Sequence, residues 1–534
     1  MTQNMTLPDP VAAGVASGWR VLDGAAQTQD LQLHCDVLII GTGAGGGMTA
    51  EVLAKDGLDV LMVEEGALRS SRDFRLLESK AYAELYQEAA SRKTADKAIN
   101  ILQGRTVGGS TTVNWTSAFR TPADTLNWWG ERYGLHGLNP QAMAPWFDMA
   151  EARLGIADWL TDPNPNNSVL ERGCQALGLK HGRIRRNVRG CWNLGYCGMG
   201  CATNAKQSML VTSIPGALEH KAGLLSRARV ERLLPAADGK SVLGAEGSLL
   251  AADGHRLTGR RFSIKARQVV LAAGAIGSPA ILLRSGLAGA QVGKRTFLHP
   301  VLISGAVMPQ RIEPYNGAPQ TVYSDHFMHT QALDGPLGYK LEVPPIHPLL
   351  MGVTLSGFGA DSAMLMQQLP HLNVMLALLR DGFHPDSQGG QVRLRGDGSP
   401  ELDYPLNDVV WDGVRRSWLT MAELQFAAGA RQVQIIHEQA ALQSSWKAAR
   451  EHIMQLPLKA LLARVVSAHV MGGAAMSGHP EDGVVDEYGR HWTLRNLSII
   501  DGSVFPTSIG ANPQLSIYAF ALRAAHQLRT TLQG

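Results

Sequence analysis

The sequence predicts a mixed α/β fold, α+β overall, with a parallel sheet in one domain and an antiparallel sheet in another. A βαβ unit lies within residues 35–66, and a second strand, glycine turn and helix pattern occupies residues 269–287. Short alternations of apolar and polar residues, such as 391–395 and 401–404, recur later in the chain. Helices between strands favour the parallel sheet, whereas alternation favours the antiparallel one. The 534 residues, 45% of them hydrophobic, suffice for at least two domains.

The βαβ unit opens with an apolar run at residues 37–40, which has the length and β-branched content of a buried parallel strand. The run breaks into GTGAGG, residues 41–46, which fits the spacing G-x-G-x-x-G. We expect a helix over residues 48–55, a stop at Gly57 and a second strand over residues 60–63. A glycine turn in this setting binds the diphosphate of a dinucleotide at the helix N-terminus.

Individual residues of this unit have distinct expected roles. Gly41 permits the tight turn, Gly43 lets backbone N–H groups approach the diphosphate, and Gly46 lets the helix pack against the strand. Glu64 ends the second strand, where an acid accepts hydrogen bonds from the adenosine ribose. An acid at this place favours FAD or NAD over NADP.

A run of small residues, GRTVGGSTTVNW at 104–115, follows the βαβ unit. Such a run has too little side chain to build a core, so its backbone is expected to lie against a ligand. The alternative is a loop without a ligand. Because apolar residues flank the run and would anchor it, ligand contact is the favoured interpretation.

Composition excludes several classes of function. The 49 basic and 46 acidic residues give a net charge of +3 without a basic tract, so nucleic-acid binding is not expected. Residues 1–33 lack the pattern of a secretory signal, which predicts a cytoplasmic protein. No run of 18 apolar residues occurs, so a spanning helix is not expected, whereas peripheral membrane contact stays open. Five cysteines, an odd number, argue against a disulfide framework.

The C-terminal part carries two further motifs, SAHVMGGAAM at 467–476 and NLSIIDGSVFPTSIGANP at 496–513. Together with the glycine turn, the 104–115 run and the 269–287 pattern, they resemble the glucose-methanol-choline (GMC) oxidoreductase family of FAD enzymes. Within that family, the chain looks nearest to the long-chain alcohol oxidases and their bacterial relatives. The resemblance implies a Rossmann-like FAD-binding domain, an antiparallel-sheet substrate cap domain, and a connecting segment with a cysteine-rich loop. These are expected at residues 34–125, 202–305 and 456–534 (FAD-binding domain), 306–455 (cap) and 126–201 (connection).

The resemblance also extends the set of residues expected to bind FAD. Some family members attach FAD covalently through a histidine at the position of Val113, so a non-covalent flavin is expected here. The motifs and the resemblance together assign FAD binding to Gly41, Gly43, Ala44, Gly45, Gly46, Glu64, Glu65, Arg105, Gly108, Gly109, Ser110, Asn114, Val230, Asp501, Gly502, Asn512 and Pro513.

Cys191, Cys197 and Cys201 lie close together in a glycine-rich segment. Thiolates favour soft or borderline metals, but a tetrahedral zinc site needs a fourth ligand and no neighbouring Cys or His supplies one. The spacing is similar to that of membrane-linked sugar dehydrogenases of the family, which carry a three-iron cluster, and the alcohol oxidase branch also has cysteine-rich segments here. An iron-sulfur cluster and a ligand-free loop therefore both stay open, and no metal ligand is assigned.

His469 and Asn512 are the catalytic residues that the resemblance implies. Oxidation of an alcohol removes the hydroxyl proton while a hydride leaves the adjacent carbon for flavin N5, so a base that titrates near neutrality is expected. His469 suits that role, and the amide of Asn512 can donate to the developing alkoxide. Among the other histidines, His299, His479 and His491 have no such support.

The sequence thus predicts an FAD-dependent oxidoreductase that oxidises the CH–OH group of hydrophobic primary or secondary alcohols, a class that includes long-chain alcohols, with an unassigned electron acceptor. Two alternatives stay open: a dehydrogenase that passes electrons through an iron-sulfur cluster to a quinone or cytochrome, and a lyase with redox-silent FAD. Residues 344–379 are rich in Met and Leu and nearly uncharged. A stripe of this kind is usually core, but it could also line an apolar substrate tunnel or touch a membrane.

Overall fold

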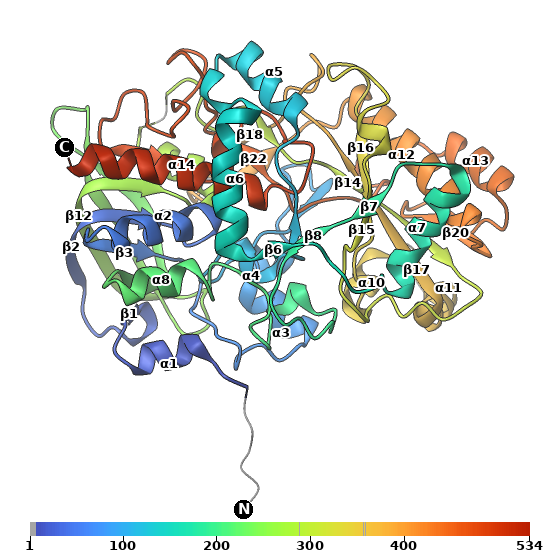
Figure 1. Cartoon of the computed structure of the whole chain (residues 1–534), viewed down its shortest axis with the longest axis horizontal. Helices are drawn as coiled ribbons and strands as arrows, with labels where there is room; N and C mark the ends of the chain where they lie inside the picture. Colours follow the sequence, from blue (N-terminus) through green and yellow to red (C-terminus); the bar gives the residue numbers. More distant parts are fainter. Residues whose placement is uncertain (1–6, 288, 356, 358, 534) are drawn as a thin grey trace, which may run out of the picture.

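The computed structural model describes residues 7–287, 289–355, 357 and 359–533, which form two large sheets with helices around them (Figure 1). The first sheet has the order β1-β9-β3-β2-β12-β11-β10, with β23 paired to β12. Its central strands are parallel, and β10 and β11 extend it in antiparallel fashion. The bounds are β1 (Arg20–Asp23), β2 (Leu31–Ile40), β3 (Val60–Val63), β9 (Gly223–Ser226), β10 (Ala228–Pro235), β11 (Val242–Leu250), β12 (Leu257–Leu271) and β23 (Leu497–Ile499).

The predicted βαβ unit is present as β2, α2 (Ala44–Lys55) and β3. Helix α2 begins four residues earlier than the sequence suggested, because Gly43 is its N-cap and the glycines form its first turn. Glycine is a poor helix former, so propensity alone places the start too late. The glycine turn and the N-terminus of α2 are therefore formed by the same residues, 41–46.

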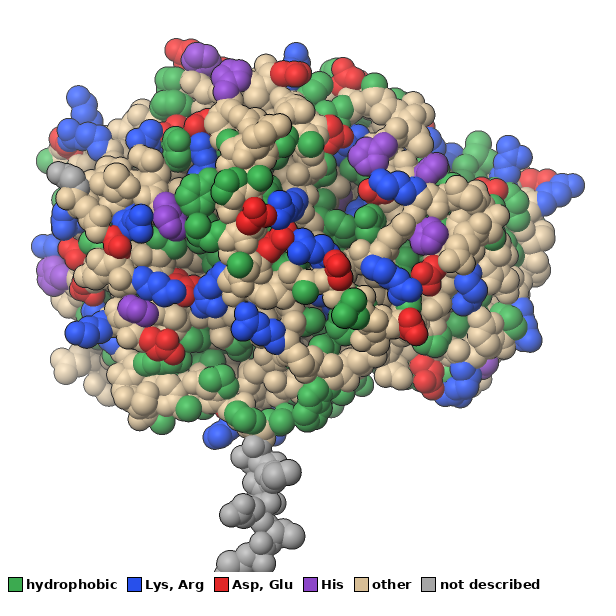
Figure 2. All heavy atoms as spheres, viewed as in Figure 1, with side chains coloured by type: hydrophobic (Ala, Val, Ile, Leu, Met, Phe, Trp, Pro, Cys, Tyr) green, Lys and Arg blue, Asp and Glu red, His purple; other side chains and the backbone are tan. Residues whose placement is uncertain are grey.

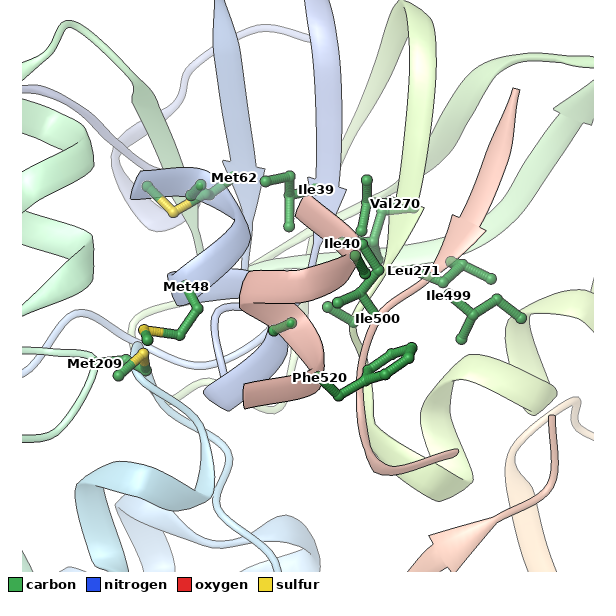
Figure 3. Packing of buried hydrophobic residues seen from close by; sticks show 14 of the residues in the cluster. Ile39, Ile40, Met48, Met62, Met209, Val270, Leu271, Ile499, Ile500 and Phe520 are labelled. Atoms are coloured by element: carbon green, nitrogen blue, oxygen red, sulfur yellow. The ribbon is translucent and has the colours of Figure 1, made fainter. Parts of the chain in front are cut away.

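The core of the first domain lies between this sheet and the helices α2 and α14 (Gln514–Gln533). Figure 3 shows buried side chains from both layers converging there. Strand β23 lies parallel beside β12, with Val269 opposite Leu497 and Leu271 opposite Ile499. The C-terminal part of the chain is therefore built into the same sheet as the N-terminal βαβ unit. The labelled residues in Figure 3 are Ile39, Ile40, Met48, Met62, Met209, Val270, Leu271, Ile499, Ile500 and Phe520.

The second sheet has the order β4-β21-β14-β17-β16-β15-β7, with β20 paired to β14. All its pairs are antiparallel except β4 with β21, which confirms the predicted antiparallel sheet. Strands β4, β7 and β21 come from outside residues 306–455, so this sheet draws on several parts of the chain. The bounds are β4 (Ile99–Ile101), β7 (Gly182–Arg183), β14 (Val301–Val307), β15 (Val322–Ser324), β16 (Tyr339–Glu342), β17 (Leu372–Leu379), β20 (Gln432–Ile435) and β21 (Val465–Ser467).

The two faces of the second sheet are covered differently. One face packs in a core with α7 (Pro165–Leu177), α12 (Asp408–Ala427) and α13 (Trp446–Gln455). The other carries a smaller apolar cluster with residues of α10 (Pro348–Thr354) and α11 (Ala360–Gln367). Residues of this second face also line the candidate active site.

Smaller elements complete the fold. The alternating segments near residues 391 and 401 form a separate hairpin of β18 (Gln391–Leu394) and β19 (Pro400–Asp403) and do not join the large sheet. Other small strands are β5 (Ser117–Ala118), β6 (Ile156–Ala157), β8 (Arg185–Asn187), β13 (Thr296–Phe297) and β22 (Met471–Gly472). The remaining helices are α1 (Pro10–Ala16), α3 (Glu78–Leu85), α4 (Ser110–Val113), α5 (Ala123–Tyr133), α6 (Pro140–Leu154), α8 (Ser213–Glu219) and α9 (Gly274–Arg284).

The surface agrees with the balanced charge of the sequence. Basic and acidic side chains are interspersed over the face shown in Figure 2. Among the described residues, no helix combines the length and the apolar character needed to cross a membrane.

Substitution of Phe520, in α14, tests the importance of the core that joins the C-terminal part of the chain to the first sheet. Its side chain is buried, so Phe520→Ala should lower the free energy of unfolding by about 3–5 kcal/mol. Met149→Ala, at a half-exposed position, should change it by less than about 0.5 kcal/mol. Urea unfolding of the two purified variants measures the difference. Equal effects would contradict this account of the core.

Candidate active site

A cavity of about 940 Å³ lies where the two sheets approach each other. This is near the upper end of the usual size of ligand sites. Its wall is formed by the β2–α2 turn, the 104–117 segment, the start of α9, the C-terminal motifs, and apolar residues of β14 and β17. The structure brings these predicted site residues together around it: Gly41, Gly43, Ala44, Gly45, Glu64, Glu65, Arg105, Gly109, Ser110, Asn114, Val230, His469, Asp501, Gly502, Asn512 and Pro513.

Gly46 and Gly108, also assigned to FAD binding, do not line the cavity. A Cβ atom at Gly46 would lie 2.0 Å from the carbonyl oxygen of Gly41, so Gly46 serves the close packing of helix on strand. Gly108 has a φ of +90°, and its N–H donates to Thr42 Oγ1 at 3.0 Å. Both glycines shape the wall without contributing surface to it.

The N-terminus of α2 opens onto the cavity at Gly43, its N-cap. A Cβ atom at Gly43 would meet nothing nearer than Gly109 Cα at 4.0 Å, so a ligand can approach this backbone. From the other side, a Cβ atom at Gly109 would lie only 2.8 Å from Gly43 Cα. Free N–H groups and the helix dipole favour an anionic group here, as the diphosphate of FAD requires.

The two acids after β3 occupy different environments. Glu64 is buried, and its carboxylate accepts hydrogen bonds from Thr42 N (3.1 Å), Thr42 Oγ1 (2.7 Å) and Gly66 N (2.9 Å). Burial raises the pKa of Glu64, although these donors oppose the rise. Glu65 pairs with Arg105 at 3.0 Å. Glu64 therefore fixes the glycine turn from within, and both acids reach the cavity wall.

Asp501 joins two of the predicted motifs. Its carboxylate accepts hydrogen bonds from Gly274 N at 2.8 Å and Ser278 Oγ at 2.6 Å, at the start of α9. It also accepts from Ser503 N at 2.8 Å, which caps the short helix Gly502–Val504. Burial raises the pKa of Asp501. The side chain thus holds the C-terminal motif against the 269–287 motif.

A buried lysine, which the sequence analysis did not single out, fixes the 104–117 segment. Lys206 Nζ donates to the carbonyl oxygens of Thr112 (2.7 Å), Asn114 (2.8 Å) and Cys197 (2.7 Å). Burial lowers its pKa to about 8. The cysteine-rich loop is therefore tied to the segment that lines the cavity.

The structure gives no support to a metal centre in the cysteine-rich loop. All five cysteines are free, and Cys201 Sγ accepts a hydrogen bond from Lys206 N at 3.4 Å. Within the described ranges, no three His, Cys, Asp or Glu side chains are placed to hold a metal ion. The loop acts here as a packed partner of the 104–117 segment.

His469 follows β21 and faces the cavity next to a second histidine, His299. Their Nδ1 atoms are 3.1 Å apart, so one ring donates to the other, and the rings stack with centroids 5.3 Å apart. Burial, with the charge of Lys340, lowers the pKa of His469 to about 3. Burial also lowers the pKa of His299 well below its ordinary value. His469 is therefore neutral over a wider pH range than a base titrating near neutrality would be.

His299 is held in place by its backbone. Its φ of +49° is a conformation that non-glycine residues rarely adopt. The buried carboxylate of Asp381 accepts hydrogen bonds from Leu298 N and His299 N, both at 3.0 Å, and from Tyr404 OH at 2.8 Å. These hydrogen bonds to Asp381 hold the backbone of His299 in its unusual conformation. In this conformation the ring of His299 contacts that of His469.

Asn512 is oriented by a buried ion pair from β16. Lys340 Nζ lies 2.7 Å from Glu342 Oε1 and donates to Asn512 Oδ1 at 2.9 Å. Asn512 Nδ2 donates to Glu342 Oε2 at 3.2 Å. Lysine can only donate hydrogen bonds and an ionised carboxylate can only accept them. The amide oxygen of Asn512 must therefore face Lys340, and its NH₂ group must face Glu342. Among the described residues, the second N–H of Asn512 makes no further side-chain hydrogen bond and can serve a ligand.

The sequence patterns did not identify four residues around the site: His299, Lys340, Glu342 and Lys206. No motif of the sequence supported His299, although it lies in the segment GKRTFLHP, residues 293–300. For Lys340 and Glu342 a signal existed, because two charges flank Leu341 in an otherwise apolar strand. Alternation places both on one face, and charges buried on one face of a strand need partners.

Together, three features define the class of dinucleotide-dependent oxidoreductases: a Rossmann-like sheet, a cavity at the N-terminus of α2, and a histidine and an amide that line the same cavity. Models of the N-terminal and C-terminal GMC oxidoreductase domains match residues 82–301 and 385–521, which together exceed half of the chain. The chain belongs to the GMC oxidoreductase family. It is an FAD-dependent oxidoreductase acting on CH–OH donors, which confirms the cofactor and the enzyme class predicted from the sequence.

Relatives agree with this assignment, and a solved structure shares the fold. A long-chain-alcohol oxidase of Arabidopsis thaliana is 28% identical over 92% of this chain and 68% of its own length. An uncharacterized GMC-type oxidoreductase of Sinorhizobium fredii is 29% identical over 94% of this chain and 96% of its own. The formate oxidase of Aspergillus oryzae has the same fold, with a TM-score of 0.68 at 15% identity over 95% of this chain and 99% of the other.

Lys340 gives the site a pH dependence. Burial lowers its pKa to about 8, so its charge is lost as the pH rises through that value. We expect the rate of flavin reduction by an alcohol to fall above pH 8, because the charge beside Asn512 disappears. Arginine stays charged, so Lys340→Arg should move the decline to higher pH. Stopped-flow reduction between pH 6 and 10 (about two units either side of that pKa) measures it, and identical profiles would contradict the role of Lys340.

Lys206 should control how tightly the cofactor is held. Lys206→Met leaves three buried carbonyl groups without their donor, which loosens the 104–117 segment. We expect at least about tenfold weaker FAD binding, the effect of losing about 1.4 kcal/mol. Titration of the apoprotein with FAD measures the dissociation constant. Lys221→Met, at an exposed site, is the control and should bind FAD as the wild type does.

Proposed function

We propose that this protein oxidises hydrophobic primary or secondary alcohols, with non-covalently bound FAD as hydride acceptor, His469 as base and Asn512 as the donor to the substrate oxygen. The observation that carries the proposal is that His469 and Asn512 line the same cavity as the glycine turn and the two acids. FAD, when bound, would supply N5 as the acceptor of the hydride. The glycine turn, Glu64 and the 104–117 segment would hold it, as their open backbone and charge allow.

His469 would take the hydroxyl proton of the alcohol. Its low pKa keeps the ring neutral, so a lone pair is available at ordinary pH. When the shared proton lies on Nδ1 of His469 and is donated to His299, the other ring nitrogen, Nε2, carries that lone pair. In this arrangement His299 would act as a positioning residue that favours this tautomer and this orientation of the base.

Asn512 would stabilise the oxygen as its proton leaves. An amide cannot take up the proton, but its N–H donates to an oxygen that becomes negative. Lys340 and Glu342 fix the direction of that N–H before the substrate arrives.

The apolar wall favours a hydrophobic alcohol. Val301, Leu376, Leu378 and Val466 line the cavity beyond His469. Such side chains contact hydrocarbon more favourably than a polar sugar. The relative named as a long-chain-alcohol oxidase supports the same class of substrate. Val113, in place of a histidine, supports non-covalent attachment of the flavin.

His469→Ala tests the assignment of the base. We expect flavin reduction by an alcohol to slow by about 10²–10⁴-fold, the usual contribution of general base catalysis, while FAD stays bound. Anaerobic stopped-flow absorbance gives the rate, and the flavin-to-protein absorbance ratio gives the cofactor content. His479→Ala, at an exposed histidine, is the matched control. Unchanged reduction in His469→Ala would reject the proposed base.

A further inference from the structure

A second cavity of about 40 Å³ lies farther along the sheet face that helps to line the active site. The active-site cavity touches Val301, Leu376 and Leu378, on β14 and β17. The second cavity touches Gly305 and Val307 of the same β14, and further residues of β17. The two cavities are therefore neighbours along one pair of strands.

The register of β14 and β17 shows how little separates the cavities. Val301 lies opposite Leu378, Ile303 opposite Leu376, and Val307 opposite Leu372. Alternate residues of a strand share a face, so these side chains form one row. Leu376 lines the active-site cavity and its cross-strand partner Ile303 lines the second. The pair Ile303 and Leu376 thus separates the two cavities. The whole row, from Val301 to Val307, is about 20 Å long, at about 3.4 Å per residue.

The residues of the row are apolar, as a binding site for a hydrocarbon chain requires. Val301, Ile303, Val307, Leu372, Val374 and Leu376 are buried in one apolar cluster. The lining of the second cavity contains no charged residue. Cavities lined in this way stay dry and bind apolar groups.

Helices α10 and α11 form the far wall of the row. Met351 of α10 and Leu365 of α11 face the second cavity. On the outside of the same helices, Val353 and Met364 are 61% and 57% exposed. Figure 1 shows the two helices beside β17, at the lower right of the molecule. The row thus runs from His469 to a wall that is apolar on both sides.

We propose that this row binds the aliphatic chain of the alcohol, with its hydroxyl group at His469 and Asn512 and its tail passing Ile303 and Leu376 toward α10 and α11. The inference rests on the proposed oxidation of alcohols in the first cavity. It adds a subsite for the tail and assigns it to β14 and β17. The Met- and Leu-rich segment 344–379 is then a wall of that subsite as well as core.

Gly305 allows the subsite to be filled without distorting the strand. A Cβ atom there would meet only Gln434 O, at an ordinary 3.7 Å, and the added side chain would enter the second cavity. Gly305→Leu should therefore block the tail close to the active site. Val307→Phe should block it farther along. Gly352→Leu, on the exposed side of α10 where a Cβ meets nothing within 4 Å, is the matched control.

The test measures kcat/KM for flavin reduction by straight-chain alkan-1-ols of increasing length. In the wild type and in Gly352→Leu, kcat/KM should rise by about fourfold per methylene, the equivalent of about 0.8 kcal/mol for each buried CH₂, until the row is filled. In Gly305→Leu, kcat/KM should stop rising at a shorter chain length than in any other of these proteins. In Val307→Phe it should stop rising at a chain length between those of Gly305→Leu and the wild type. The rate with ethanol should be unchanged in the control Gly352→Leu. The same cut-off in all four proteins, or no rise in the wild type, would overturn the subsite.

A second readout separates this inference from the proposed function. Dansyl-labelled undecanoic acid, an aliphatic probe, should bind the wild-type holoenzyme and Gly352→Leu with a rise in fluorescence, and Gly305→Leu at least about tenfold more weakly. If no alcohol reduces the flavin but this pattern holds, the proposed function fails and the aliphatic subsite stands. If the probe binds Gly305→Leu as tightly as the wild type, the subsite is rejected. Flavin content and melting temperature confirm that each variant is folded.

Discussion

The carboxylate of Asp501 holds together the distant parts of the chain on which the whole site depends. Its hydrogen bonds to Gly274 and Ser278 fix the C-terminal motif to the start of α9. Strand β23 comes directly before Asp501 and lies parallel beside β12. The carboxyl ends of these two strands therefore lie at the same edge of the sheet. A buried carboxylate is costly unless it is hydrogen-bonded, and here several donors meet that requirement. The segment that carries Asn512 to the cavity wall follows this junction directly.

The second sheet acts on the chemistry through charge as well as shape. Lys340 and Glu342 are fully buried on β16, yet the residue they orient, Asn512, belongs to the C-terminal motif of the first domain. A buried ion pair contributes little net stability, because desolvation offsets the attraction. Its role here is to fix the direction of one amide, that of Asn512. Burial, with the charge of Lys340, also lowers the pKa of His469. The contact between the sheets thus orients a residue of the candidate active site.

Local patterns could be predicted from the sequence, and long-range placements could not. The glycine turn, the βαβ unit and the terminal motifs depend on spacings within about thirty residues, and all were found. His299 and Lys340 reach the site only through the pairing of β14, β17 and β16, which no local pattern specifies. Lys206 was missed for the same reason, because its carbonyl acceptors lie on segments far away in the sequence. The start of α2 was misplaced because its first turn is glycine.

The position of β23 in the first sheet has a consequence for biosynthesis. During translation, the strands up to β12 emerge from the ribosome more than two hundred residues before Leu497–Ile499. Until then the nascent chain displays a glycine turn and an incomplete sheet edge beside β12, with one side of the cofactor cradle missing. The wall of the cavity is therefore complete only after the ribosome has synthesised the C-terminal motif.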